Sequence, residues 1–416
     1  MKVVSRQNWL LVALAQLVLV ACLGLLLRYL LVAPIEGLNY KYLLHAHSHV
    51  ALLGWLYTAV MVVLLLVFLP PELRTKKTYT WQFWLSQAAV LGMLLSFPVQ
   101  GYAAASIAFS TAHLLLNYWF IYQFLKDANR AGVGRFSQQL SFRFIKAALF
   151  FLAVSSLGPW SLGPVMATGH SGGSLYYNAI YFYLHFQYNG WFTFAVLGLF
   201  FWLLEQHGLG VSRKKGNLIF RLLFWSCMPA FLLSVLWTQP AAWVYWAGGA
   251  SGMAQVVAVL LLLVHVWPVR QKLKLLFTGL SGWLFWLAVA AFIAKNLLQL
   301  MTALPYIADI AYRFRYLIIA YLHLVLIGFI SFFLFAFMGK QGWLQLQTNK
   351  SLWGMGLFLL GFIATEALLF LQGALFWWEA GAIPYYHELL FGVSIFLPAG
   401  MLLFFMSQWK DKMQVC

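Results

Sequence analysis

Long apolar runs, separated by short polar stretches, fill almost the whole chain of 416 residues. Most runs reach about 20 residues, the length that an α-helix needs to cross a bilayer. No long polar insertion interrupts them, so residues 1–416 are expected to form a single transmembrane domain. The pattern predicts an all-α, polytopic membrane protein with about twelve spans, at roughly 9–33, 44–69, 81–101, 103–126, 142–162, 175–205, 217–237, 241–267, 275–302, 314–338, 352–375 and 383–407.

Composition supports this class and gives an orientation. The chain is 63% hydrophobic and only 8% charged, which excludes an ordinary soluble domain and indicates a surround of membrane lipid. With the N-terminus in the cytoplasm, most of the 26 Lys and Arg residues fall on cytoplasmic loops. The sequence therefore predicts a protein of the bacterial inner membrane with both termini cytoplasmic. The net charge of +17 is assigned to those loops and not to nucleic-acid binding.

The second predicted span opens with three histidines within five residues, His45, His47 and His49. On a helix, His45 and His49 lie one turn apart and share a face, while His47 points elsewhere. Histidine inside a membrane is costly unless it has a partner or a ligand. Such a pair can offer alternative ligands to one metal, or one ligand and one hydrogen-bonding neighbour.

The same local pattern recurs along the chain as a histidine, four spacers, a glycine and an aromatic residue. Full matches start at His49, His185 and His323, and partial matches start at His113 and His387. A small glycine lets a neighbouring helix or a flat ring approach the backbone. The alternative is chance, since glycine and aromatic residues are abundant in this chain.

In the predicted topology these five histidines lie on spans that run from outside to inside, at a similar depth in the outer half of the membrane. Such a layer suits a ring-shaped metallocofactor, and five separately hydrogen-bonded histidines are the alternative. We also expect that His113, His185 and His387 can share a second metal ion, such as copper, or line one cavity.

Imidazole is a good ligand for haem iron. The CxxCH signature of covalent attachment is absent from the sequence, which favours a non-covalent haem b. Haem propionates require cations at the membrane edge, and Arg313 and Arg315, outward of His323, are the candidates. The alternative is that both arginines are ordinary interfacial anchors.

Twelve helices, cytoplasmic termini and histidines near the outer face resemble subunit I of the haem-copper oxidase superfamily, which includes nitric oxide reductases. The resemblance implies a low-spin haem between His49, with His45 as competitor, and His323. It implies His185 as a copper ligand. Where the family has a histidine pair on helix 7, this chain has 224–228, FWSCM. Locally, the stretch 47–55 is similar to the NnrS family of haem and copper proteins linked to nitric oxide stress.

The resemblance implies a haem-binding redox membrane protein acting in respiration, in nitric oxide or oxygen reduction, or in protection against nitric oxide. Its electrons would come from quinol or a cytochrome, and its substrate would be a small gas. Alternative functions are a proton- or metal-ion-coupled transporter and a haem or copper assembly factor. Among other polar residues, Lys295 is expected to snorkel, Glu366 to relay protons or form a buried hydrogen bond, and the Gly-rich loop 163–174 to form a turn or lid.

The charge distribution gives the first testable prediction. A reporter fused after Cys416 is expected to behave as cytoplasmic in a topology assay, because the basic loops hold both termini on that side. A periplasmic response would overturn the span count and, with it, the shared depth of the histidines.

Overall fold

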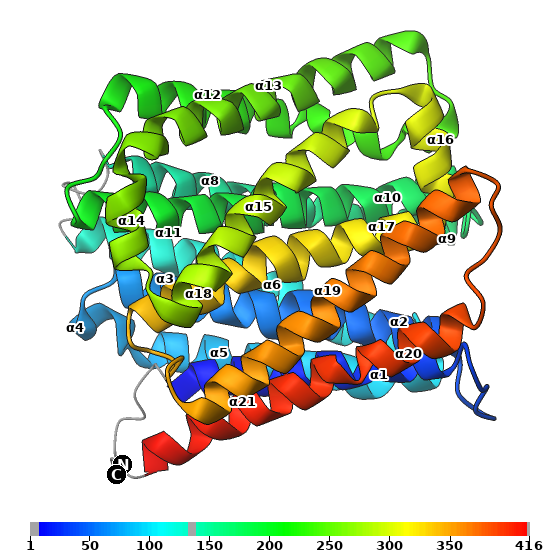
Figure 1. The fold of residues 1–416 in the computed structure, drawn as a ribbon, viewed down its shortest axis with the longest axis horizontal. Helices are drawn as coiled ribbons and strands as arrows, with labels where there is room; N and C mark the ends of the chain where they lie inside the picture. The colour runs from blue at the N-terminus through cyan, green and yellow to red at the C-terminus, as the bar shows by residue number, and fades with distance from the viewer. Residues whose placement is uncertain (1–7, 132–138, 414–416) are drawn as a thin grey trace. The chain divides into compact units, whose positions relative to one another are not determined.

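The computed structural model describes residues 8–131 and 139–413, and all regular elements in these ranges are helical (Figure 1). Cys416 lies outside the described residues. Contacts divide the chain into two compact units. Unit 1 comprises Met1–Ala131, Gly279–Ser281 and Leu334–Cys416, and unit 2 comprises Gly132–Thr278 and Gly282–Phe333. The all-α class is confirmed, and the action of both units as one domain stays a prediction.

Unit 1 contains the N-terminal and C-terminal helices. They are α1 (Trp9–Tyr29), α2 (Tyr40–His49), η2 (Val50–Leu56), α3 (Tyr57–Phe68), α4 (Pro71–Arg74), α5 (Lys77–Gln100), α6 (Ala104–Arg130), α19 (Asn349–Trp377), α20 (Tyr386–Ser394) and α21 (Phe396–Met413). Helix α18 (Phe332–Lys340) begins in unit 2 and continues in unit 1.

Unit 2 contains the middle of the chain. Its elements are α8 (Leu140–Ser155), α9 (Leu157–Ala167), α10 (Ser174–His185), η3 (Phe186–Phe192), α11 (Thr193–Gln206), α12 (Arg213–Cys227), η4 (Pro229–Ser234), η5 (Leu236–Thr238), α13 (Ala242–Val266), η6 (Trp267–Val269), α14 (Arg270–Leu276), α15 (Gly279–Met301, whose first residues belong to unit 1), α16 (Pro305–Arg313), α17 (Arg315–His323) and η7 (Leu324–Ser331).

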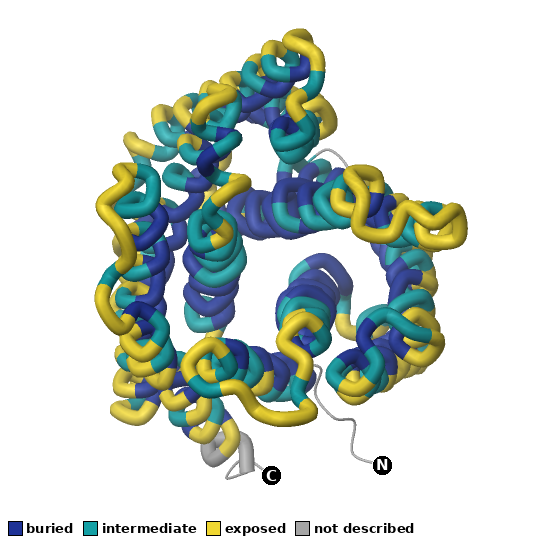
Figure 2. The backbone as a smooth tube through the Cα atoms, turned by 90° about the vertical axis from the view of Figure 1, so that its right-hand side faces the viewer, coloured by how far each residue is buried: buried dark blue, intermediate teal, exposed yellow. Residues whose placement is uncertain are grey.

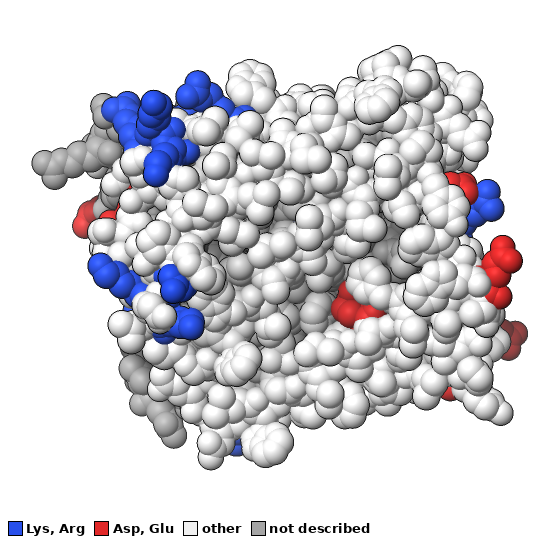
Figure 3. Space-filling model, turned by 45° about the horizontal axis from the view of Figure 1, so that its top comes forward, with Lys and Arg blue, Asp and Glu red and all other residues white. Residues whose placement is uncertain are grey.

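Ten described helices are long and apolar enough to cross a membrane. Two further helical stretches, Ser174–Gln206 and Arg213–Thr238, correspond to the sixth and seventh predicted spans. Of these ten, the second span, Tyr40–Phe68, is the most enclosed, with 83% of its most apolar stretch buried. Figure 2 views most helices end-on and shows buried residues on the sides that face other helices. On the face drawn in Figure 3, most Lys and Arg gather toward the left side, and the broad middle is uncharged except for one acidic patch, as the membrane-spanning part of a protein requires.

The expected Gly-rich loop at 163–174 is shorter than the sequence indicated, and its first part is not a turn or lid. Helix α9 continues through Gly163 and Pro164 and ends at Ala167. Proline in a helix removes one backbone hydrogen bond, and this is tolerated because neighbouring groups re-satisfy the carbonyl in membrane helices. The turn begins only at Thr168, whose hydroxyl donates to the Pro164 carbonyl at 3.0 Å.

Within unit 1, helices pack closely where glycine replaces a side chain. A Cβ added at Gly354 of α19 would lie 2.6 Å from the backbone nitrogen of Phe404 on α21. One added at Gly400 of α21 would lie 2.5 Å from the nitrogen of Phe358. Small residues at such crossings allow backbones to approach, which is the usual way for helices to associate in lipid.

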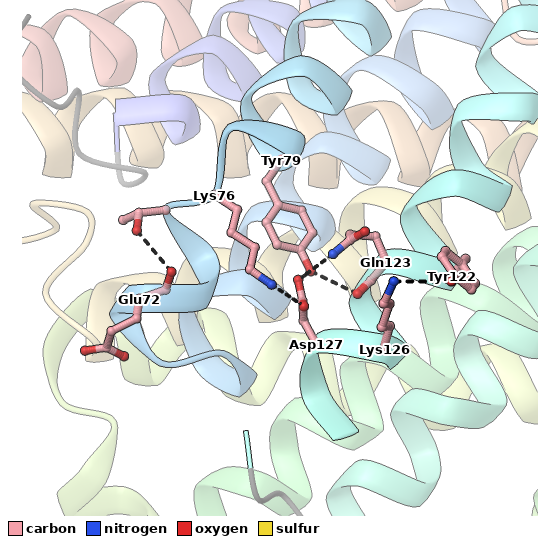
Figure 4. Close-up of polar contacts among 8 residues, drawn as sticks. Glu72, Lys76, Tyr79, Tyr122, Gln123, Lys126 and Asp127 are labelled. Atoms are coloured by element: carbon pink, nitrogen blue, oxygen red, sulfur yellow. Dashed lines mark hydrogen bonds and ion pairs between the residues drawn. The ribbon is translucent and has the colours of Figure 1, made fainter. Parts of the chain in front are cut away.

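The helix pair α5–α6 is anchored at one end by a buried carboxylate, Asp127, which is 0% exposed (Figure 4). Lys76 Nζ donates to Asp127 Oδ1 at 2.5 Å, and Tyr79 and Gln123 donate to Oδ2 at 3.0 and 2.7 Å. All the donors lie near the same end of the two helices. The network satisfies a charge that would otherwise be expensive to bury.

Replacing Asp127 by Ala is expected to lower the free energy of unfolding by about 2–4 kcal/mol, since the half-buried ammonium of Lys76, the buried Tyr79 and the half-buried Gln123 lose their acceptor. Thermal unfolding of the purified protein in detergent measures this change. Glu72→Ala on the neighbouring exposed helix α4 is the matched control and is expected to change little. Equal effects of the two substitutions would contradict a structural role for the network.

Candidate functional site

Each of the three full histidine patterns coincides with a change in backbone hydrogen bonding. His49, His185 and His323 are the last residues of α2, α10 and α17, and each is followed at once by a π-helical segment, η2, η3 and η7 respectively. In a π-helix the hydrogen bonds join residues five apart, which equals the spacing from histidine to glycine in the sequence pattern. His113 and His387 lie inside regular α-helices, α6 and α20. A following π-helical segment thus distinguishes the histidines of the full sequence pattern from those of the partial pattern.

Such π-helical segments inside α-helices occur often at functional sites. Here they place the histidine side chain at a junction between two helical geometries. The spacing of five was visible in the sequence, and it was the one signal from which these segments could have been inferred.

The glycines of the pattern make room for neighbouring helices. A Cβ on Gly54 would lie 3.3 Å from the Gln16 side chain of α1, and one on Gly190 would lie 2.5 Å from Phe151 Cβ of α8. Of the two uses expected for these glycines, helix packing is the one that the structure shows at both positions.

In unit 1, His49 is held in a defined orientation. Its Nδ1 donates to the backbone carbonyl of His45 at 2.8 Å, so in the neutral ring the lone pair belongs to Nε2. The ring lies 4.4 Å from that of Phe97, and Nε2 is 3.5 Å from the Tyr102 hydroxyl. His45 is therefore a hydrogen-bonding neighbour through its carbonyl oxygen, and its own ring packs edge-on to Tyr102 at 4.6 Å.

The third histidine of the cluster has a different environment, as expected from its helical position. His47 Nδ1 contacts the carbonyl oxygen of Val20 on α1 at 3.1 Å. A Cβ on Gly24 would lie 3.1 Å from His47 Cε1, so this glycine gives the ring its space. His47 thus fastens α2 to α1.

In unit 2, His185 uses both ring nitrogens in hydrogen bonds. Its Nε2 donates to the Cys227 carbonyl at 2.9 Å, and its Nδ1 accepts from Asn189 Nδ2 at 3.1 Å. In this arrangement no lone pair is left for copper. Asn189 and Cys227 were not singled out from the sequence, although Asn189 at i+4 of a buried histidine was a usable signal.

His113 is 0% exposed in unit 1, and both of its ring nitrogens lack a hydrogen-bond partner among the described residues. The ring of Tyr57 lies edge-on at 4.8 Å, and His49 is within electrostatic reach. Asn117, one turn along α6, is also buried with both amide atoms unpartnered in the described chain. His387 of α20 has a buried Nδ1 in the same condition.

Within the described residues, no three His, Cys, Asp or Glu side chains come together as a metal site would require. The second metal ion that the sequence assigns to His113, His185 and His387 stays a prediction. His113 and His387 belong to unit 1, and His185 belongs to unit 2.

His323 is half-buried at the end of α17 in unit 2. The backbone breaks at Phe314, between α16 and α17, so the two candidate arginines lie on different helices. Arg313 forms an exposed ion pair with Asp309, with 2.8 Å between Nε and Oδ2. Arg315 is exposed and begins α17, about 12 Å along the helix axis from His323.

Lys295 was expected to snorkel to the membrane surface. It does not, because the residue is only 2% exposed. Within unit 2 it lies in electrostatic reach of His185 and Cys227. Glu366 of α19 is buried in unit 1, and the charge of Arg28 on α1 acts on it. Each unit thus contains one further buried ionisable side chain, Lys295 in unit 2 and Glu366 in unit 1.

Comparison with known proteins identifies a similar fold but no relative by sequence. No protein-family model and no curated protein matches the sequence. Among the solved structures, the chain is similar to a haem-copper terminal oxidase determined as a dimer by cryo-EM. The TM-score is 0.67 at 12% sequence identity, over 98% of this chain and 84% of that chain. The fold is therefore like that of haem-copper oxidase subunit I, as expected, whereas the local likeness to the NnrS family is not confirmed.

Packing at the π-helical glycines can be tested directly. Gly190→Ala is expected to lower the free energy of unfolding by about 1–3 kcal/mol, because its Cβ would overlap Phe151. Gly356→Ala on α19 is the control, since its Cβ meets nothing within 4 Å. The control is expected to be neutral or stabilising by up to about 1 kcal/mol. Thermal unfolding in detergent compares them, and a neutral Gly190→Ala would contradict the packing role.

Proposed function

We propose that this chain is a haem-containing membrane protein of respiratory electron transfer, in which His49 would hold a low-spin haem b and His323, as the sequence predicts, would be its second ligand. The observation that carries the proposal is the orientation of His49. Its Nδ1 donates to the His45 carbonyl, so Nε2 keeps its lone pair. Histidines that bind metals commonly donate their other ring nitrogen to a carbonyl or carboxylate in this way.

The surroundings of His49 fit a flat, largely apolar cofactor. Phe97 lies beside its ring, and the hydroxyl of Tyr102 is at the edge of hydrogen-bonding distance from Nε2. Because this contact between the Tyr102 hydroxyl and Nε2 is long and weak, a bond from Nε2 to iron would replace it at little cost. His49 is preferred to His45 because only His49 is followed at once by a π-helical segment and carries the Gly-Trp spacing.

His323 is the second proposed ligand because it shares that local design. It ends α17, is followed by the π-helical segment η7, and has glycine and phenylalanine five and six residues on. Arg315 is the proposed partner for a propionate, since it is exposed and lies about two turns outward of His323. Arg313 is the weaker candidate, because its guanidinium already pairs with Asp309.

When bound by two imidazoles, haem iron accepts and releases one electron. The chain's own residues would then bind and orient the group. The His45 carbonyl fixes the His49 ring, Phe97 packs beside that ring, and Arg315 would balance the charge of a propionate. A quinol or a cytochrome is the proposed electron donor.

We do not extend the proposal to copper, or to the reduction of nitric oxide or oxygen. Both ring nitrogens of His185, the expected copper ligand, form hydrogen bonds, with Cys227 and Asn189. Among the described residues no three His, Cys, Asp or Glu side chains lie close enough to bind one metal ion. The similar solved structure is that of a haem-copper terminal oxidase, which supports haem in this fold, at a sequence identity too low to transfer a reaction.

The test is the reduced-minus-oxidised visible spectrum of the purified protein. Wild type is expected to show a low-spin haem b signal, and His49→Gly and His323→Gly are each expected to lose it because one axial ligand is missing. Free imidazole added to either variant is expected to restore the low-spin band by occupying the vacated position.

His47→Ala is the matched control in the same stretch, because its ring is engaged with Val20. It is expected to keep the spectrum, although α2 is held less firmly. A wild type that binds no haem, or variants of His49 and His323 that retain the wild-type spectrum, would refute the assignment. Loss of haem without imidazole rescue, in variants that still insert and elute normally, would count against direct ligation.

A further inference from the structure

A surface groove runs between α12 and α13 in unit 2, far in sequence from the histidines of the proposed haem site. Its volume is about 630 Å³, within the range of roughly 300–1,000 Å³ that small-molecule sites occupy. One wall is a single face of α12, and the other is a single face of α13 made of small residues. The main apolar lining is Leu218, Leu222 and Trp225 on α12, with Ala247, Ala250 and Ala254 opposite.

One end of this groove is strongly basic. Arg221 lines it, and α12 begins with Arg213, Lys214 and Lys215, about 12 Å back along the helix axis. Arg143 of α8 lies in electrostatic reach of Arg213 and Arg221. Figure 3, in which α12 and α13 come forward, shows Lys and Arg side chains gathered in this region.

This positive charge has little internal compensation. Neither ion pair of the described residues involves Arg221, whose Nε only donates weakly to the Asn217 carbonyl in its own helix. Arg143 lies over the Phe220 ring at 4.5 Å and donates to Asn217, so its position is fixed beside that of Arg221. The groove lining contains no acidic side chain.

We propose that the α12–α13 groove binds an anionic phospholipid. An acyl chain would lie along Leu222 and Trp225, and the phosphate would meet Arg221 and the basic start of α12. Clusters of Lys and Arg beside a membrane helix attract anionic lipids, at about 1 kcal/mol for each basic residue near the surface. The exposed Trp225 ring gives the chain a flat apolar contact.

The alternative occupant is a partner helix against the small residues of α13. A second copy of this chain would bring the same arginines and lysines together at the groove end, where like charges repel. A lipid with an anionic head and an apolar tail instead matches both the charge gradient and the lining.

Native mass spectrometry of the delipidated full chain tests the proposal. The protein is titrated with phosphatidylglycerol and, separately, with phosphatidylcholine of the same acyl chains. Tighter binding of phosphatidylglycerol is expected. Arg221→Gln is expected to weaken it about fivefold, which corresponds to about 1 kcal/mol for one basic contact. Lys272→Gln, an exposed cation on α14 outside the groove, is the charge-matched control and is expected to have no effect.

The apolar wall has its own pair of variants. The double variant Ala250→Leu, Ala254→Leu would fill the groove and is expected to weaken the binding of both lipids. Met253 is exposed on α13 outside the lining, so Met253→Leu is expected to leave the binding of both lipids unchanged. Equal binding of the two lipids would overturn the proposal, as would equal effects of Arg221→Gln and Lys272→Gln. A dimer that the groove-filling pair abolishes would assign the groove to a partner helix instead.

Discussion

Backbone hydrogen bonding in a medium without water is the constraint on which the rest of this structure depends. In a bilayer each amide and carbonyl must find a partner within the protein, and helices are the way to do so in a single segment. The described spans meet this demand with helical ladders, chiefly of two kinds. Residues four apart are joined over most of each span, and residues five apart are joined directly after His49, His185 and His323.

The second constraint is the cost of burying polar side chains, and the described residues meet it to different degrees. Asp127 and His185 are satisfied by protein partners. His113 and Asn117 have none among the described residues, although each is almost fully buried. An unmet buried group costs about 1–3 kcal/mol, so these atoms mark one part of unit 1 that a bound water or ligand would stabilise.

The fold class and most span positions could be predicted from the sequence, because a bilayer imposes one length and one composition on each helix. The site was predicted in part. The different directions of the His47 and His49 rings follow from helical phase, and the structure shows them, whereas the role of His49 stays a proposal. Other features depend on segments far apart in the chain, and local patterns do not contain them. Lys295 looked like a snorkelling residue, and its burial comes from packing within unit 2. The hydrogen bonds of His185 require Cys227, 42 residues away.

The π-helical segments also bear on how this chain can change its length. A π-turn holds roughly one residue more than an α-turn, and removing one residue from η2 would let the ordinary ladder close again. The side chains beyond η2 would then keep nearly the same direction about the helix axis, because the wide turn had accommodated the extra residue. In a regular α-helix the same deletion would turn every later side chain by about 100°. In unit 1 a single-codon deletion in η2 would thus leave the buried face of α3 on its neighbours, whereas one inside α3 would carry the later part of that face away from them.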